Sequence, residues 1–200
     1  STYSFTCNKR RKVFSCSMGT IGKDFKYKII KNFLSKEEVD LLSTYCEIKH
    51  KTNIDFDLEI NDHSRNSFYG DLIMEALLLR KKKLMEQETG KKLLPTYSFW
   101  RVYTQFADLK KHKDRASCEI SVTIKINSDE TEWPIYIDGK ACHLDKGDAA
   151  IYLGCELEHW REEFQGDHQF QCFLHYVDAD GKNKDYYLDQ RQFWGTKKCR

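Results

Sequence analysis

The sequence lacks an excess of charge of either sign, since 33 Lys and Arg residues nearly balance 31 Asp and Glu residues. A surface that binds phosphates is normally basic, so this balance argues against nucleic acid or an anionic membrane as a partner. Two local basic runs, Lys9 to Lys12 and Arg80 to Lys83, are typical of solvated faces. No apolar stretch approaches the length that crosses a bilayer, and the first residues contain no apolar signal core. We therefore expect a cytoplasmic protein.

The eight cysteines are scattered and include no CxxC pair, which argues against a zinc-ribbon site and favours free thiols. With 40% hydrophobic and 14% aromatic residues, the composition is that of a folded protein. A chain of 200 residues is long enough to bury a core. We predict a basic N-terminal segment over residues 1–24 and one domain over residues 25–200.

Two helices are predicted in the first half of the chain. Ser35 followed by Glu38 forms a capping box, which predicts a helix over about 35–47. A second amphipathic stretch predicts a helix over about 71–88, with Gly90 placed to end it. The polar stretch 49–70 between them is interpreted as a loop that covers a substrate.

From residue 95 onward, short aromatic and β-branched runs alternate with turn signals. An earlier strand is expected within 25–34, and Asp138-Gly139 is a type I′ hairpin signal. The pattern favours an α+β, mainly β protein: a jelly roll with the N-terminal helices packed on one sheet and a C-terminal extension over 178–200. The strands are expected over 98–106, 117–127, 132–137, 140–144, 148–153, 156–161 and 168–177, within a region of about 98–177.

The pattern His-x-Asp, which can supply two ligands to one metal ion, occurs as HKD at 112–114 and as HLD at 143–145. A mononuclear iron site with two histidines and one carboxylate needs a third ligand, a distant histidine that the fold brings beside the pair. Because such a short motif often arises by chance, either copy can also be an ordinary polar stretch of a loop.

The spacing distinguishes the two copies. In a jelly roll several strands separate the pair from the distal histidine. Four predicted strands lie between Asp114 and His159, whereas one lies between Asp145 and His159 and two between Asp145 and His175. The first motif together with His159 therefore has the spacing of an iron site.

The order of motifs resembles one family of enzymes over about residues 25–177. The chain is similar to the iron(II)- and 2-oxoglutarate-dependent dioxygenases, in particular to their prolyl 4-hydroxylase-like branch with small microbial and viral members. This family has a cupin-like double-stranded β-helix core. The segments that carry the resemblance are FLSKEE, YSFWRVYTQFADLKKHKDRASCEISVTIKI, EWPIYI, KGDAAIYLGCELEHW and FLHYV.

The resemblance implies a catalytic metal site. His112, Asp114 and His159 would hold Fe(II) and leave three coordination positions for 2-oxoglutarate and O2, with ascorbate as an optional further cofactor. The reaction would hydroxylate a C–H bond and release succinate and CO2. Related halogenases lack the carboxylate, so Asp114 favours hydroxylation.

The resemblance also implies a site for the cosubstrate. Tyr103 matches the family tyrosine that binds a carboxylate of 2-oxoglutarate. The family usually places Lys or Arg about ten residues after the distal histidine, and this chain has none there. His168 is the nearest match, Arg161 is the best nearby cation and Arg101 is a further candidate.

Several roles stay open on the sequence alone. Arg115 lies beside the first two ligands and could orient them, and Gln171 could contact the cosubstrate or the substrate. The first substrate class implied by the resemblance is a prolyl or other side chain of a peptide or protein, and a small molecule or a nucleobase is an alternative. A cupin-like binding module without turnover is the alternative from another class.

Overall fold

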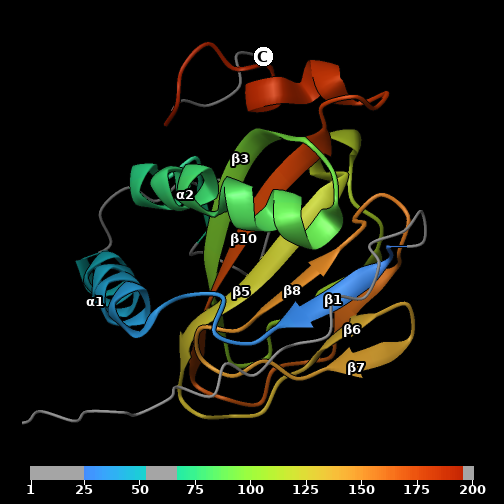
Figure 1. The fold of residues 1–200 in the computed structure, drawn as a ribbon. Helices are drawn as coiled ribbons and strands as arrows, with labels where there is room; N and C mark the ends of the chain where they lie inside the picture. The colour runs from blue at the N-terminus through green and yellow to red at the C-terminus, as the bar shows by residue number, and fades with distance from the viewer. Residues whose placement is uncertain (1–24, 53–66, 196–200) are drawn as a thin grey trace, which may run out of the picture.

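The computed structural model describes residues 25–52 and 67–195. Its strands form a six-stranded sheet in the order β1-β8-β5-β10-β3-β2 and a four-stranded sheet in the order β4-β9-β6-β7 (Figure 1). From β3 to β10 the chain passes repeatedly from one sheet to the other, which is the double-stranded β-helix predicted from the sequence. The elements are β1 (Tyr27–Ile30), α1 (Lys36–Thr52), β2 (Ser67–Tyr69), α2 (Leu72–Thr89), β3 (Leu93–Thr104), β4 (Leu109–His112), the 3-10 helix η1 (Ala116–Cys118), β5 (Ile120–Ser128), β6 (Ile135–Ile137), β7 (Lys140–Cys142), β8 (Ala149–Tyr152), β9 (His159–Arg161), β10 (His168–Asp178) and the 3-10 segment η2 (Lys184–Gln190).

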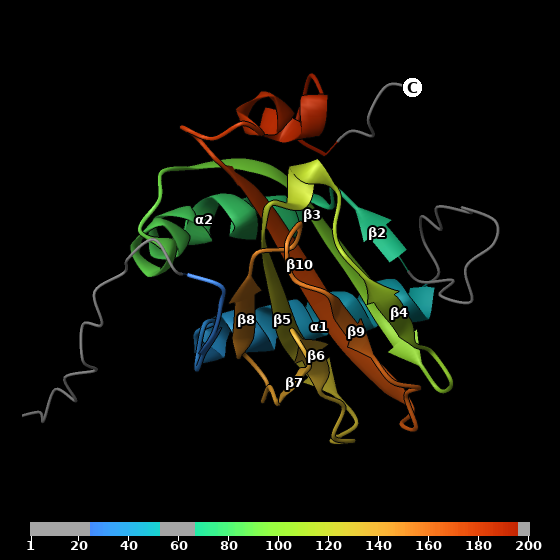
Figure 2. The same cartoon turned by 90° about the vertical axis from the view of Figure 1, so that its right-hand side faces the viewer.

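The large sheet separates two buried layers. Successive residues of a strand point to opposite faces, so each central strand contributes to both layers. The helices α1 and α2 lie on the side of this sheet that faces away from the small sheet (Figure 2). The core between helices and sheet includes Leu42, Met74, Leu78, Trp100, Val122, Ile124, Cys172 and Leu174. Within the described residues, no helix has the length and apolar character needed to cross a membrane.

Both predicted helices begin at the expected signals. The Glu38 carboxylate accepts a hydrogen bond from the Ser35 amide at 2.8 Å, and the Ser35 hydroxyl accepts one from the Glu38 amide at 3.2 Å. The helix α1 continues to Thr52, five residues beyond the predicted end, because no Gly or Pro interrupts it and its last turn is basic. The helix α2 is capped by the Asp71 side chain and ends at Gly90, whose φ of 69° is left-handed.

The stretch 49–70 is not a loop over its whole length. Its first four residues belong to α1, and Ser67–Tyr69 form β2, which pairs with β3. The interpretation as a substrate cover otherwise falls on residues 53–66, which lie outside the described part of the chain.

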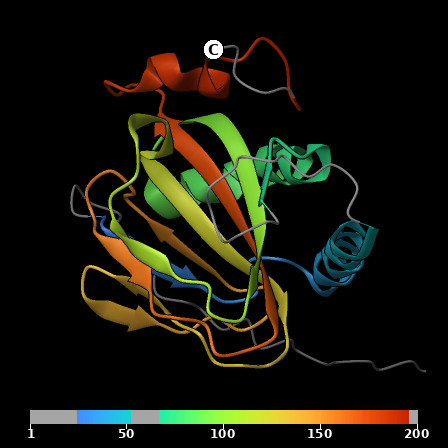
Figure 3. The same cartoon turned by 180° about the vertical axis from the view of Figure 1, so that it is seen from behind.

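Each predicted strand is present, with boundaries that shift by a few residues. Asp138 and Gly139 both have positive φ, 50° and 78°, as the type I′ hairpin requires. The strand β4 was not predicted, because Lys110 and Lys111 break the alternation of apolar and polar residues. This strand lies at the edge of the small sheet (Figure 3). Its two central lysines, Lys110 and Lys111, are exposed to water.

The segment after β10 packs back onto the large sheet. Arg191 donates to the Glu75 carboxylate and to the Thr96 carbonyl, each at 3.0 Å. The side chains of both members of this ion pair are at most 3% exposed. Asp189, two residues before Arg191, is also buried and accepts two hydrogen bonds of 2.8 Å from Arg115. These two contacts hold η2 against the barrel.

Replacing Arg191 by Met should lower the free energy of unfolding by about 3–5 kcal/mol, because it leaves the Glu75 carboxylate buried without its counter-charge. Urea denaturation measures this change. The matched control is Arg80→Ala, which removes an exposed contact with Glu38 and should cost about 0–1 kcal/mol. Equal losses in the two variants would contradict a special contribution from the buried pair.

Candidate metal centre

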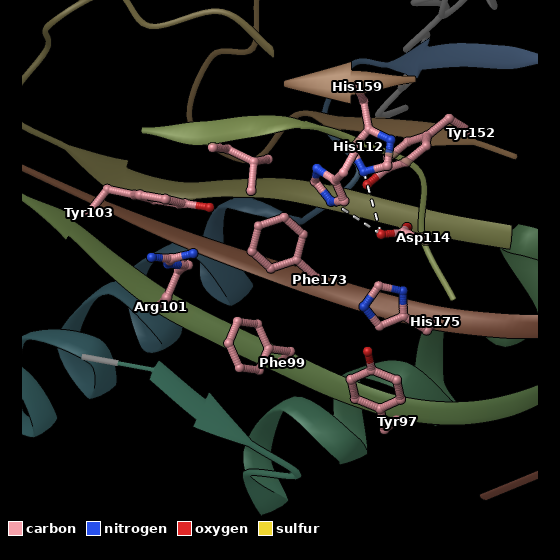
Figure 4. Close-up of a pocket in the computed structure, with 11 residues that line it drawn as sticks. Tyr97, Phe99, Arg101, Tyr103, His112, Asp114, Tyr152, His159, Phe173 and His175 are labelled. Carbon is pink, nitrogen blue, oxygen red and sulfur yellow. Dashed lines mark ion pairs between the residues drawn. The ribbon is translucent and has the colours of Figure 1, made fainter. Parts of the chain in front are cut away.

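Three side chains from the first motif and from β9 meet at one end of the barrel. His112 ends β4, His159 begins β9, and the two residues are direct partners across the small sheet. The Asp114 amide donates to the Gly154 carbonyl at 2.8 Å, which holds the residue after β4 has ended. The Nε2 atoms of both histidines lie 3.5 Å from Oδ1 of Asp114 (Figure 4). The predicted ligand set is therefore assembled in space.

The ring orientation of both histidines leaves Nε2 free to bind a metal. Nδ1 of His112 lies 2.6 Å from the Lys110 carbonyl, and Nδ1 of His159 lies 3.0 Å from the Leu157 carbonyl. A carbonyl only accepts, so each Nδ1 carries the proton and each Nε2 has a lone pair when the ring is neutral. Two lone pairs and a carboxylate oxygen thus converge on one point.

The charge of Asp114 is maintained although the residue is largely buried. Burial by itself raises the pKa of a carboxyl group, but the contacts with His112 and His159 outweigh it and hold the pKa of Asp114 well below its usual range. The same contact with Asp114 raises the pKa of His112. The site therefore presents an ionised carboxylate, the form that binds a cation.

The second His-x-Asp motif forms no such cluster. His143 is exposed and pairs with Glu132 at 2.6 Å, whereas Asp145 pairs with Lys31 at 2.8 Å. Each side chain is more than half exposed. The structure therefore places the first His-x-Asp motif, and not the second, beside His159, in agreement with the spacing argument.

A cavity of about 160 Å³ extends from the candidate ligands into the barrel. Tyr97, Phe99, Arg101 and Tyr103 line it at every second position of β3. Phe173 and His175 line it from β10, as Figure 4 shows. This alternation is the signal by which the sequence could have identified the wall, because the inward residues of a strand recur with a period of two.

Tyr103 and Arg161 lie at the inner end of the barrel with unused hydrogen-bonding capacity. Oη of Tyr103 and Nε of Arg161 are buried and have no hydrogen-bond partner within the described residues. Both side chains pack against Trp133, with distances of 4.7 Å between the Tyr103 and Trp133 rings and 4.6 Å from the Arg161 guanidinium to the Trp133 ring. Burial lowers the pKa of Arg161 to about 10. Oη of Tyr103 and Nε of Arg161 are thus two donor atoms near the Trp133 indole for which the described residues supply no acceptor.

Lys125 is a further interior cation, which the sequence reasoning did not single out. In the register of the large sheet, Lys125 of β5 lies opposite Gln171 of β10, and Gln171 lies opposite Arg101 of β3. Burial lowers the pKa of Lys125, and the nearby charge of Arg161 lowers it further. Among the described residues, no ion pair joins Lys125 or Arg161 to a carboxylate. The inner end of the barrel is therefore positively charged.

Three other predicted site residues have different surroundings. His168 contacts Asp167 at 2.9 Å and is not among the residues that line the cavity. Arg115 binds Asp189 rather than the side chains of the candidate ligands. Gln171 is buried and donates to the Thr123 hydroxyl at 2.6 Å.

Comparison with known proteins identifies the fold. No protein-family model and no curated protein sequence matches the chain. Among solved structures, a Pseudomonas putida prolyl-4-hydroxylase is similar with a TM-score of 0.58 and 14% identity, covering 76% of this chain and 92% of that one.

Two further solved structures are similar at comparable identity. The viral collagen prolyl hydroxylase of Paramecium Bursaria Chlorella virus-1, in complex with 2-oxoglutarate, has a TM-score of 0.56 and 12% identity, covering 76% of this chain and 96% of that one. EctD from S. alaskensis, with 2-oxoglutarate and 5-hydroxyectoine, has a TM-score of 0.64 and 14% identity, covering 83% of this chain and 80% of that one. At this identity the likeness establishes the shared fold.

Proposed function

We propose that this protein is an iron(II)- and 2-oxoglutarate-dependent oxygenase that hydroxylates a C–H bond. The observation that carries the proposal is the convergence of Nε2 of His112, Nε2 of His159 and Oδ1 of Asp114 on one point at the mouth of a cavity. Two histidines and one carboxylate are the donor set of non-haem iron oxygenases. The similarity of the fold to enzymes with 2-oxoglutarate in their structures supports the same chemistry.

The spacing of the three donor atoms fits one metal ion. Atoms that bind an ion at about 2.1 Å and subtend about 90–110° lie roughly 3.0–3.4 Å apart. The distance of 3.5 Å from Oδ1 of Asp114 to each histidine is close to this range. When bound, Fe(II) with 2-oxoglutarate and O2 supplies the oxidant for hydroxylation, with release of succinate and CO2. The backbone carbonyls of Lys110 and Leu157 keep both imidazoles in the binding tautomer.

The inner end of the cavity fits the far carboxylate of the cosubstrate. Tyr103 lines the cavity, and Arg161 packs against the same Trp133 ring just outside the lining. A carboxylate bound beside this indole would accept from the buried donors of both residues. Lys125 of β5 adds a second buried positive charge. Arg101 lines the cavity beside Tyr103, with its guanidinium 4.3 Å from the tyrosine ring (Figure 4). These cations take the place of the Lys or Arg that the sequence lacks on β10.

The substrate we propose is a prolyl or other side chain of a peptide or protein. Two of the similar structures are prolyl hydroxylases, and the aromatic wall of Phe99 and Phe173 gives the cavity an apolar surface beside the ligands. EctD was solved with 5-hydroxyectoine, so the same fold also accommodates a small molecule. The cavity itself is compatible with either class.

Anaerobic addition of Fe(II) and then 2-oxoglutarate to the apo-protein should produce the weak visible charge-transfer band of a chelated 2-oxo acid. His112→Ala should abolish the band, because it removes one of the three protein ligands. His143→Ala is the matched control, since this exposed histidine belongs to the second motif, and it should leave the band unchanged. Iron binding without any band would overturn the assignment of the cosubstrate.

Tyr103→Phe should weaken binding of 2-oxoglutarate by about 10–100-fold, because a hydrogen bond to a charged group contributes about 1.5–3 kcal/mol. Titration of the iron-loaded protein, followed by the visible band, measures the dissociation constant. His168→Ala should leave this constant unchanged, since His168 lies outside the cavity lining. A larger effect of the His168 change than of the Tyr103 change would reverse the assignment.

Incubation with 2-oxoglutarate, Fe(II) and proline-containing peptides should yield peptides with one added oxygen atom and an equal amount of succinate. Mass spectrometry of the peptides and a succinate assay measure the two products. Free proline and other small molecules in parallel reactions test the alternative class. Oxygen added only to the small molecules would contradict the peptide substrate while leaving the reaction type intact.

A further inference from the structure

We propose that Ser121, itself held by His175, is a positioning residue that keeps Asp114 bound to the metal through one oxygen only. We also propose that residue 154 is a glycine because the second oxygen of Asp114 occupies the space that a side chain would need. The inference rests on the proposed metal centre and concerns residues of β5, β10 and the turn after β8, none of which is a ligand in it.

The two carboxylate oxygens of Asp114 have separate partners. Oδ1 faces the two histidines, whereas Oδ2 lies 2.9 Å from the Ser121 hydroxyl. If both oxygens bound the metal, the carboxylate would occupy one more coordination position, which the cosubstrate or O2 needs. A donor on Oδ2 opposes this rotation, because turning the carboxylate would break a hydrogen bond to a charged group.

The direction of the hydrogen bonds follows from the neighbours of Ser121. Its oxygen lies 2.9 Å from Nδ1 of His175, 2.9 Å from Oδ2 of Asp114 and 3.1 Å from the Cys118 carbonyl. A hydroxyl has one proton to donate and can accept from an N–H group. With the proton of His175 on Nδ1, the serine accepts from His175 and donates to the carboxylate.

His175 is fixed from its other side by an aromatic and ionic stack. Its ring lies 4.6 Å from the ring of Tyr97, and the guanidinium of Arg115 lies 4.7 Å from that same Tyr97 ring. Arg115 is in turn bound by both carboxylate oxygens of Asp189. Asp189 of η2 thereby supports the histidine that holds Ser121.

Gly154 closes the space behind the carboxylate. A Cβ atom on this residue would lie 2.4 Å from Oδ2 of Asp114, 2.4 Å from the Cys118 carbonyl and 2.8 Å from Oγ of Ser121. The φ of Gly154 lies outside the left-handed region, so space rather than backbone conformation demands glycine here. Because the Gly154 carbonyl also accepts from the Asp114 amide, the backbone cannot move away freely.

The test uses Co(II) alone as a spectroscopic probe added to the purified apo-protein. Ser121→Ala should weaken Co(II) binding by about 10–100-fold, the range for residues that orient ligands, and should change the visible spectrum of the bound ion. Gly154→Ala should weaken binding at least as much, because the added methyl group displaces Oδ2. A chelator competition measures the affinity, and thermal melting of each apo-protein verifies that it is folded.

Ser98→Ala is the matched control. Ser98 is also a fully buried serine that contacts a carboxylate, in this case Glu75, but it faces the helices. Its replacement should leave Co(II) affinity and spectrum unchanged.

Wild-type affinity and spectrum in Ser121→Ala would overturn the inference while the proposed metal centre stands. An equal loss of affinity in the Ser98 control would also overturn it, because the effect would then be a general loss of packing. Failure of the wild-type protein to bind Co(II) and Fe(II) would instead overturn the proposed function, and the inference with it.

Discussion

Asp114 keeps a negative charge although only 14% of its side chain is exposed, and the surrounding residues must replace the lost hydration. The Ser121 hydroxyl donates to Oδ2, and both histidines approach Oδ1. The hydrogen bond from the Asp114 amide to the Gly154 carbonyl fixes the backbone that carries the carboxylate. These partners come from both sheets and from the turn after β8. The carboxylate therefore depends on the correct packing of the whole barrel, and its low pKa reflects that arrangement.

The two faces of the large sheet have different roles: one forms the apolar core with the helices, and the other lines the cavity. One face packs against α1 and α2 through apolar side chains, so that the strands cannot shift without exposing the core. The other face carries polar and aromatic residues that point into the barrel, including Tyr103, Lys125 and His175. A register shift by one residue would exchange the two sets. The helical layer thus fixes which residues face the cavity.

The charge distribution within the barrel suits a dianion that also chelates a metal. At the mouth lies a carboxylate beside the Nε2 atoms of two histidines, whereas Arg161 and Lys125 are buried in the barrel and form no ion pair with a carboxylate of the described residues. Buried charge is costly when no opposite charge compensates it, so the two buried cations favour an anion bound near them. This charge distribution is consistent with the proposed binding of iron and 2-oxoglutarate.

Local patterns determined much of this protein. The capping box at Ser35, the turn at Asp138-Gly139 and the alternation within β3 and β10 depend on neighbours in the chain, and the strand count separated the first His-x-Asp motif from the second. Only the tertiary structure decided which cations reach the barrel interior, that His168 is not part of the cavity lining, and that Ser121 and Gly154 lie against the second oxygen of Asp114 with His175 behind Ser121. These contacts join residues up to 54 positions apart, and such proximity follows from strand register and sheet packing rather than from sequence spacing.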